Sequence, residues 1–252
     1  MSRIVAGRRA VREALDARGA ELSLVVVDRG ARAALRELCD VARERGVRVE
    51  ERETEELDAL AHGVRHQGVI ALAGEFHYVE LDEIIDASPS GLLIALDEIT
   101  DPHNFGAIVR SAVAFGVDGV ITLRHRSAPV TPVVVRAAAG ATEHARIARV
   151  TNLANTLAEL SERGIEVVGL DATGAVDIDE LGHPPGGRVL VVGSEGKGLR
   201  RLVRERCDVL ARIPMAGPIA SLNASVAAGI ALFALARARS AQTSPGEPQG
   251  GA

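Results

Sequence analysis

The sequence predicts an α/β protein made of two units, with a mostly parallel sheet in the second. Short buried-strand runs alternate with helical patterns through residues 91–239, as in a parallel sheet covered by helices on both faces. The composition, 47% hydrophobic and 25% charged over 252 residues, is that of a globular protein with ample chain for a core.

Residues 1–73 are expected to form the first unit, a small α/β domain. Val11 and Leu15 stand four residues apart and mark one face of a helix, and Gly46 is a natural helix end. The expected elements, in order, are a helix at 8–18, a strand at 22–27, a helix at 33–45, a strand beginning at 47–49, a helix at 55–61 and a strand at 68–73.

Residues 74–90 are acidic and end in Ser-Pro-Ser, which predicts a linker with a short helix at 81–86 and suggests a mobile N-terminal domain. The second unit follows at 91–239. Its expected strands are 92–96, 119–123, 167–170 and 188–193, and its expected helices are 105–115, 132–139, 152–163 and 225–239. The tail at 240–252 lacks apolar periodicity and is expected to be disordered.

Charge and composition argue against several classes of protein. The net charge of -5 disfavours a nucleic-acid partner, but the linker alone carries five acids and no lysine or arginine, which equals the whole deficit. Cys39 and Cys207 cannot make a disulfide scaffold or a four-thiolate zinc site, and no metal is expected. No signal core or apolar run of membrane-spanning length is evident, so we expect a cytoplasmic protein without a membrane partner.

Three segments of the second unit follow predicted strands, where open α/β sheets place their ligand crevice. The first is LDEITDPHNFGAIVRSAVAFG at 96–116. Asn104 is able to cap the helix there, and Arg110 lies among small and apolar residues. Composition leaves two roles open for Arg110: pairing with an acid or solvent, or facing a phosphate or a reacting hydroxyl.

The second segment, VLVVGSEGKGL at 189–199, runs an apolar strand into Gly193, Gly196 and Gly198. Glycines allow close backbone approach and unusual dihedral angles. The spacing matches neither a P-loop nor a dinucleotide fingerprint. Glu195 therefore suits a sugar, an amine or a cation better than a polyphosphate, and a solvent-facing turn is the alternative.

The third segment, ARIPMAGPIASLNASVAAGIALFAL at 211–235, passes two prolines before Ser221-Leu222-Asn223 leads into a helix. On local chemistry alone, Ser221 or Asn223 caps that helix. A hydroxyl and free N–H groups at a helix start also suit a phosphate.

Taken together, NFGAIVRSA, GSEGKGL and IPMAGPIASLNASVA resemble, in order and separation, the three motifs of the SpoU (TrmH-like) family of RNA ribose 2'-O-methyltransferases. The resemblance covers about residues 91–239. GRRAVREAL and HQGVIALAGE extend it more weakly to the N-terminal unit, which looks like the substrate-binding domain of the ribosomal-RNA branch, similar to a ribosomal protein. It implies a C-terminal trefoil-knotted SPOUT domain, which ordinary topology rules would exclude.

The resemblance implies S-adenosylmethionine as the cofactor and a homodimer as the assembly. By motif position, the residues expected to hold the cofactor are Leu123, Gly193, Gly196, Ile213 and Leu222.

The implied reaction is methyl transfer to a ribose 2'-hydroxyl, most like guanosine 2'-O-methylation of large-subunit 23S rRNA. The residues implicated in catalysis are Arg110, Asn104, Glu195, Ser221 and Asn223. A guanidinium stays protonated far above neutral pH, so we expect Arg110 to stabilise alkoxide charge and grip a phosphate rather than to act as the base. Asn104 and Glu195 are expected to fix its geometry, and Ser221 and Asn223 to hold the target nucleotide.

The N-terminal unit is expected to bind RNA. Residues 1–36 hold eight arginines against four acids, and Arg3, Arg8, Arg9 and Arg12 cluster near one helix start. They form either a solvated helix face or a phosphate-contacting patch, and the resemblance favours the patch.

Other functions stay open on the sequence. A thiostrepton-resistance-type enzyme shares the two-domain layout, whereas tRNA 2'-O-methyltransferases often lack such an N-terminal domain. A catalytically silent rRNA-binding assembly factor belongs to another class, and the intact motif residues argue against it. A nucleotide-dependent oxidoreductase is disfavoured because the glycine spacing fits neither nucleotide motif.

Overall fold

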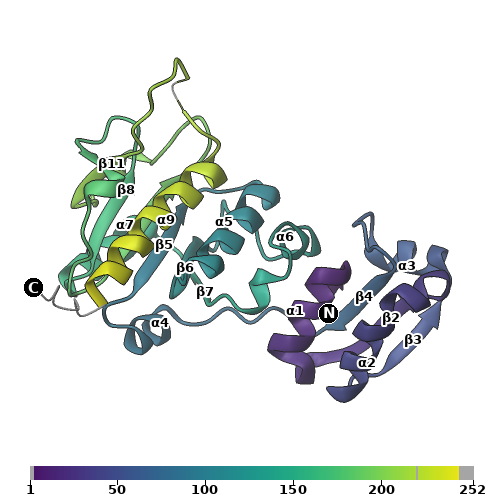
Figure 1. Cartoon of the computed structure of the whole chain (residues 1–252). Helices are drawn as coiled ribbons and strands as arrows, with labels where there is room; N and C mark the ends of the chain where they lie inside the picture. The colour runs from purple at the N-terminus through teal and green to yellow at the C-terminus, as the bar shows by residue number, and fades with distance from the viewer. Residues whose placement is uncertain (1–2, 220, 244–252) are drawn as a thin grey trace, which may run out of the picture.

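A computed structural model describes residues 3–219 and 221–243, which build two sheets with their own helices (Figure 1). The elements of the first unit are β1 (Arg3–Ala6), α1 (Arg8–Arg18), η1 (Gly19–Glu21), β2 (Leu22–Asp28), η2 (Arg29–Leu35), α2 (Arg36–Glu44), β3 (Val49–Arg52), α3 (Thr54–Ala61) and β4 (Val69–Ala73). Its strand order is β1-β4-β2-β3, with only β2 and β3 parallel.

The first unit buries apolar side chains on both faces of its sheet. Val11 and Leu15 of α1 share a core with Leu38 of α2, while Leu57 and Ala61 of α3 pack with residues of the opposite face. The four-residue spacing in α1 therefore marks a buried face, as the sequence predicts.

The second unit is built around a fully parallel sheet of order β7-β6-β5-β10-β8-β11-β9. Its strands are β5 (Leu92–Asp97), β6 (Gly119–Leu123), β7 (Ile147–Val150), β8 (Glu166–Leu170), β9 (Val176–Asp177), β10 (Arg188–Gly193) and β11 (Val209–Arg212). The helices around it are α4 (Leu81–Ala87), α5 (Pro102–Ala114), α6 (Pro132–Ala137), η3 (Ala141–Glu143), α7 (Leu153–Glu162), η4 (Ile178–Glu180), α8 (Arg201–Arg204) and α9 (Ala224–Thr243).

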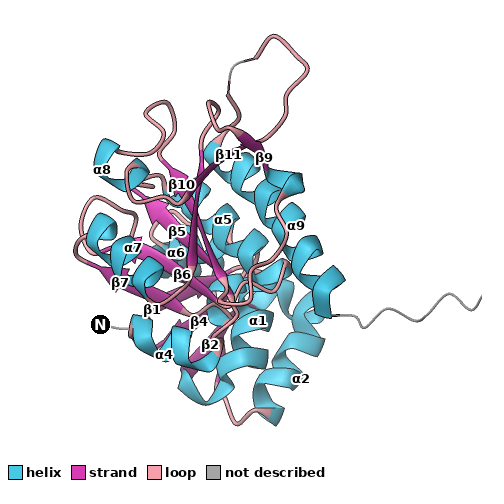
Figure 2. Ribbon diagram, turned by 90° about the vertical axis from the view of Figure 1, so that its left-hand side faces the viewer, coloured by secondary structure: helices cyan, strands magenta, loops and turns pink. Residues whose placement is uncertain are grey.

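Helices cover both faces of this sheet, which confirms the predicted α/β class. Figure 2 shows α5 and α9 on one side of the strands and α7 and α8 on the other. Residues of α5, α6 and α9 share one core cluster, and residues of α4, α7 and α8 share another. Burial on both faces explains why the strand sequences are nearly continuous apolar runs.

The expected elements are found, but some short ones were missed. β1 and β7 are four-residue strands at sheet edges that mix arginine with apolar residues, so neither forms an apolar run. The expected helix at 33–45 begins as the 3-10 turn η2. α9 continues to Thr243, so the first residues of the expected disordered tail are helical; residues 244–252 lie outside the described part of the chain.

Helix α9 corrects one expectation from the sequence. In the described ranges it is the one helix that length and composition would allow to cross a membrane, over Ala224–Gln242 with a mean hydropathy of 1.2. Ala228, Leu232 and Leu235 of this helix are fully buried in the core that α9 shares with α5. A core position accounts for the apolar residues on its inner face, whereas Val226, Ile230 and Phe233 on the outer face are exposed.

The two units are joined by a buried ion pair. Arg3 on β1 donates two hydrogen bonds to the Glu143 carboxylate on η3, at 2.5 and 2.8 Å. The two side chains are only 7% and 0% exposed. Arg18 also donates to the Glu143 carbonyl oxygen, and Val135 of α6 packs into the core of the first unit.

The linker at 74–90 packs against both units, although its composition suggests a loose connection. Val79 forms a parallel bridge with Ala148 of β7, and the Tyr78 hydroxyl accepts a hydrogen bond from the Val130 N–H at 3.0 Å. On the other side, the guanidinium of Arg3 lies 5.5 Å from the centre of the Phe76 ring. The linker is therefore part of the junction between the units.

Candidate active site

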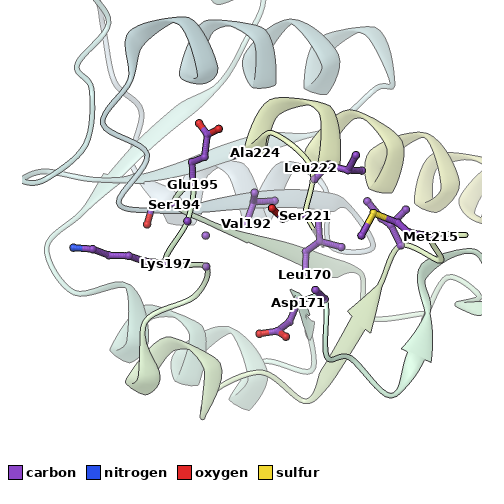
Figure 3. Close-up of a pocket in the computed structure, with 16 residues that line it drawn as sticks. Leu170, Asp171, Val192, Ser194, Glu195, Lys197, Met215, Ser221, Leu222 and Ala224 are labelled. Atoms are coloured by element: carbon purple, nitrogen blue, oxygen red, sulfur yellow. The ribbon is translucent and has the colours of Figure 1, made fainter. Parts of the chain in front are cut away.

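A pocket of about 300 Å³ opens at the carboxyl edge of the parallel sheet (Figure 3). The loops after β8, β10 and β11 and the start of α9 supply its walls. The lining residues are Leu170, Asp171, Ala172, Val192, Gly193, Ser194, Glu195, Gly196, Lys197, Gly198, Ile213, Met215, Ser221, Leu222, Ala224 and Ala227. The second and third sequence motifs therefore meet in one cavity, as the crevice rule for parallel sheets predicts.

The glycine-rich loop after β10 is a tight turn that only glycine permits at its base. A Cβ on Gly193 would lie 2.2 Å from the carbonyl carbon of Gly198, closer than side chains tolerate. Gly196 and Gly198 have φ angles of +79° and +64°, in the region that favours glycine. The turn brings the backbone to the pocket and presents Glu195 at its rim, as Figure 3 shows.

A buried carboxylate holds the far end of this loop. Asp97, the last residue of β5, pairs in register with Gly193 and is 1% exposed. It accepts hydrogen bonds from the backbone N–H of Arg200 at 2.8 Å and from Arg200 Nε at 2.7 Å. Asp97 thus fixes both ends of the glycine-rich turn, a role that sequence reasoning missed.

Asn104, Asn223 and Glu195 form a hydrogen-bonded chain, although each comes from a different motif. Asn223 Nδ2 donates to Asn104 Oδ1 at 3.0 Å, and Asn104 Nδ2 donates to Glu195 Oε2 at 3.3 Å. Asp101 caps α5 instead of Asn104, by accepting from the His103 N–H. The buried Asn104 amide is therefore available to connect α9 with the glycine-rich loop.

Asn223 combines the two roles that the sequence left open. Its Oδ1 accepts hydrogen bonds from the N–H groups of Ser225 at 2.9 Å and Val226 at 3.3 Å, which caps α9. Its Nδ2 joins the chain to Asn104. Ser221 lines the pocket from the segment just before the cap.

Arg110 lies outside this arrangement, which corrects the expectation that Asn104 and Glu195 orient it. Its side chain is exposed, it does not line the pocket, and no described residue pairs with its guanidinium. Six residues along α5 separate it from Asn104, about 9 Å of rise and a different face of the helix. Asn104 and Glu195 hold each other instead.

Four of the five expected cofactor residues line the pocket: Gly193, Gly196, Ile213 and Leu222. Leu123 does not, and this expectation was wrong. It is 5% exposed at the end of β6, in the core cluster that contains Leu153 of α7. The order of the sheet explains the error, because β5 separates β6 from β10.

Asp171 is the main pocket residue that sequence reasoning missed. Burial acts to raise its pKa, but hydrogen bonds from Thr173 and the charge of Arg204 outweigh that effect and lower it. The carboxylate is therefore ionised at neutral pH, and its ion pair with Arg204 offsets its negative charge at the wall of the pocket. Its position just after the predicted strand at 167–170 was the available signal.

The four N-terminal arginines do not form one surface. Arg3 is buried against Glu143, so its assignment to an RNA-contacting patch is corrected. Arg12 pairs with Asp16 and Glu37 at 2.9 and 3.0 Å. Arg8 and Arg9 are exposed at the start of α1, and Arg9 has only a 4.0 Å contact with Glu13.

The pocket suits a ligand that has a flat ring system and charged groups of both signs. Leu170, Ile213 and Leu222 give it apolar walls, and Glu195 and Lys197 of the glycine-rich loop bring one charge of each sign. At Gly196 a Cβ would meet no atom within 4 Å, so the missing side chain leaves free space at the rim. These features fit S-adenosylmethionine. Across residues 3–219 and 221–243, no cluster of His, Cys, Asp and Glu is arranged to hold a metal ion.

Comparison with known families and proteins agrees with this geometry. Residues 91–233 match the SpoU rRNA Methylase family, and residues 4–79 match the domain described as RNA 2'-O ribose methyltransferase substrate binding. A tRNA/rRNA methyltransferase, uncharacterized by its description, from Mycolicibacterium gilvum is 47% identical over 244 residues, which cover 94% of this chain and 76% of that protein. A TrmH family tRNA/rRNA methyltransferase, YacO by name, from Bacillus subtilis is 40% identical over 93% of this chain and 95% of its own.

A solved structure extends the likeness to the cofactor. The SpoU methyltransferase AviRb from Streptomyces viridochromogenes, in complex with AdoMet, superposes with a TM-score of 0.75 at 30% identity, covering 94% of this chain and 90% of its own. With the family match, this identifies S-adenosylmethionine as the cofactor. The chain belongs to the SpoU rRNA Methylase family of S-adenosylmethionine-dependent RNA methyltransferases.

Proposed function

We propose that this enzyme methylates a ribose 2'-hydroxyl of RNA, on a guanosine of large-subunit 23S rRNA, in the cytoplasm. The substrate-binding match at residues 4–79 is described for RNA 2'-O ribose methyltransferases, which supports the ribose as the acceptor. The relatives are named for both tRNA and rRNA. The separate N-terminal domain, which we place at 1–73, favours rRNA between the two.

The observation that carries the proposal is the chain from Asn223 through Asn104 to Glu195 beside the cofactor pocket. S-adenosylmethionine, when bound, supplies an activated methyl group. Gly193, Gly196, Ile213 and Leu222 hold the cofactor, and the amide chain fixes the acceptor side of the site. Such positioning accounts for much of the rate when the methyl donor is already activated.

Arg110 stabilises the negative charge that develops on the ribose oxygen and grips the neighbouring phosphate. Because Arg110 lies outside the pocket of its own chain, it reaches the acceptor ribose only in the RNA complex or in the homodimer proposed below. Its lack of a described partner leaves the guanidinium free for an anion. Ser221 and Asn223 hold the target nucleotide. Arg8 and Arg9, which stay exposed, contact RNA phosphates from the N-terminal unit.

The enzyme works as a homodimer through an apolar stripe on α9. Val226, Ile230 and Phe233 follow helical spacing along its outer face and are 50%, 41% and 51% exposed. The Phe233 ring also lies 5.7 Å from that of Phe115, at the end of α5, so the stripe adjoins the helix that carries Arg110. A second copy would cover this surface, since exposed apolar patches of this kind mark interaction sites.

The test uses unmodified 23S rRNA and tRNA transcripts with radiolabelled S-adenosylmethionine. We expect label in 23S rRNA, recovered after nuclease digestion as 2'-O-methylguanosine. Label in tRNA alone contradicts the rRNA assignment, and label in a base contradicts the ribose assignment. RNA binding without any transfer supports the silent-binder alternative.

A further inference from the structure

A second, polar cavity of about 230 Å³ lies where the linker meets the outer strands of the large sheet. It is lined by Phe76, His77, Tyr78, Val79, Glu80, Arg124 and Arg149. Arg124 directly follows β6, and Arg149 is the last residue but one of β7. Both arginines are thus at the carboxyl edge of the sheet, the edge that also holds the cofactor pocket.

The two arginines carry charge that no described acid neutralises. Neither Arg124 nor Arg149 forms an ion pair in the described part of the chain, and Glu80, the one acid lining the cavity, lies beyond ion-pair distance of both. Arg149 Nε is buried without a hydrogen-bond acceptor. The guanidinium of Arg149 therefore has unused donor capacity beside a polar cavity, and an anion in that cavity is a natural acceptor for its N–H groups.

The linker fixes the direction of the Arg149 guanidinium. Its central carbon lies 3.8 Å from the centre of the Tyr78 ring, in cation–π contact. The Tyr78 hydroxyl is itself held by the Val130 N–H. The guanidinium is planar, and stacking on Tyr78 fixes the orientation of that plane, so the N–H groups along its edge can meet the paired oxygens of a phosphate.

The cavity also lies between the N-terminal unit and the cofactor pocket, the two parts that we propose to contact RNA. Arg3 of the first unit reaches Phe76, whose ring lies 5.0 Å from that of Tyr78, so the wall of the cavity is continuous with the junction between the units. Three strand spacings, about 14 Å, separate β7 from β10 along the sheet edge. An RNA strand that runs from the N-terminal unit to the cofactor pocket would follow this edge.

We propose that Arg124 and Arg149, held by the linker residue Tyr78, bind a backbone phosphate of the substrate RNA at a distance from the methylated ribose. The inference rests on the proposed RNA substrate and adds a contact point to it. It gives the linker a direct part in substrate binding, through the aromatic ring that orients Arg149.

The test compares the wild type with Arg124→Gln, Arg149→Gln and the double variant. Arg146→Gln is the matched control, because Arg146 is exposed, its guanidinium has no described partner, and it lies at the opposite end of β7. Binding of a 23S rRNA transcript is measured across a salt series. The double variant should bind about three- to tenfold more weakly, with a slope of log affinity against log salt that is smaller by about 0.7 to 0.9, as for one lost phosphate contact. S-adenosylmethionine affinity should stay unchanged.

Arg124→Gln alone, at an exposed position, gives a smaller effect of the same sign and keeps the test valid if Arg149→Gln does not fold. Affinity and slope equal to those of Arg146→Gln overturn the inference and leave the proposed function intact. If inorganic phosphate raises the melting temperature of the wild type but not of the double variant, while both bind RNA equally, the site serves a free phosphate and the RNA assignment is wrong. A wild type that neither binds nor methylates the transcript overturns both proposals.

Discussion

Asn223 Nδ2 donates a hydrogen bond to Asn104 Oδ1 at 3.0 Å across 119 residues of sequence. The bond joins the start of α9 to the start of α5, and Asn104 passes it on to Glu195. A single buried amide thus connects all three motifs. Removal of the Asn104 amide therefore breaks its hydrogen bonds to Asn223 and to Glu195 at the same time.

We therefore expect Asn104→Ala to slow methyl transfer by about 100-fold, since small displacements in a positioned site have effects of that size. Stability should fall by only about 0.5–1.5 kcal/mol, the net contribution of a typical hydrogen bond, because Glu195 and Asn223 are exposed and water can replace the lost amide. Single-turnover kinetics and urea unfolding measure the two effects. Asn155→Ala, on the exposed side of α7, is the control and should change neither. Equal rates of methyl transfer for the two variants would show that the hydrogen bonds from Asn223 through Asn104 to Glu195 have no part in catalysis.

Arg110→Lys distinguishes an electrostatic role from a base. If Arg110 stabilises charge and grips a phosphate, the lysine enzyme should lose about 10²–10³ in rate, and its remaining activity should fall as the pH rises through the lysine pKa of about 10.4, because only the protonated ammonium stabilises negative charge. A pH–rate profile of the variant is the measurement. Near-full activity that rises, instead of falling, as the pH passes through an apparent pKa of about 10.4 would favour the base, which acts only when deprotonated.

Arg3→Ala should destabilise the protein strongly, because it leaves the fully buried Glu143 carboxylate without its ion-pair partner. Removing one member of a buried pair typically costs about 3–5 kcal/mol. Arg9→Ala is the matched control: its guanidinium is 68% exposed and only 4.0 Å from Glu13, so about 0.5 kcal/mol or less is expected. Denaturant unfolding measures the free energy of unfolding of both variants. A similar decrease for Arg3→Ala and Arg9→Ala would contradict a stabilising role for the buried ion pair between the units.

The thiol of Cys207 should resist alkylation in the folded protein. Burial, with the nearby charge of Asp208, raises the pKa of Cys207 to about 12. The raised pKa keeps the thiol protonated at pH 8.5, and the associated stability is lost only as the pH rises above about 9 toward 12. Iodoacetamide labelling followed by peptide mass spectrometry should be at least about tenfold slower in the native protein than in urea. Equal rates in the two conditions contradict this environment.

Sequence predicted the parallel architecture well because its central strands are buried on both faces. The runs at 119–123 and 188–193 coincide with β6 and β10. The edge strands β1 and β7 were not predicted, because arginines interrupt their apolar sequences. The deep knot of the family's fold came from the resemblance alone, since topology rules exclude it.

The site was predictable where residue type and backbone geometry coincide. Gly193 has no room for a Cβ, and Asn223 both caps α9 and reaches Asn104. Arg3 and Leu123 were misplaced because sequence separation does not reveal a partner 140 residues away or the order of strands in a sheet. Asp97 and Asp171 were missed because a single aspartate at a strand end looks the same whether it holds a loop or faces a ligand.

The most direct test of the proposed function maps ribose methylation across all ribosomal and transfer RNA from a strain that lacks this gene, against its parent. We predict the loss of one 2'-O-methylguanosine in 23S rRNA, restored by the wild-type gene and not by Asn104→Ala. An unchanged map, or a loss confined to tRNA or to a methylated base, would contradict it.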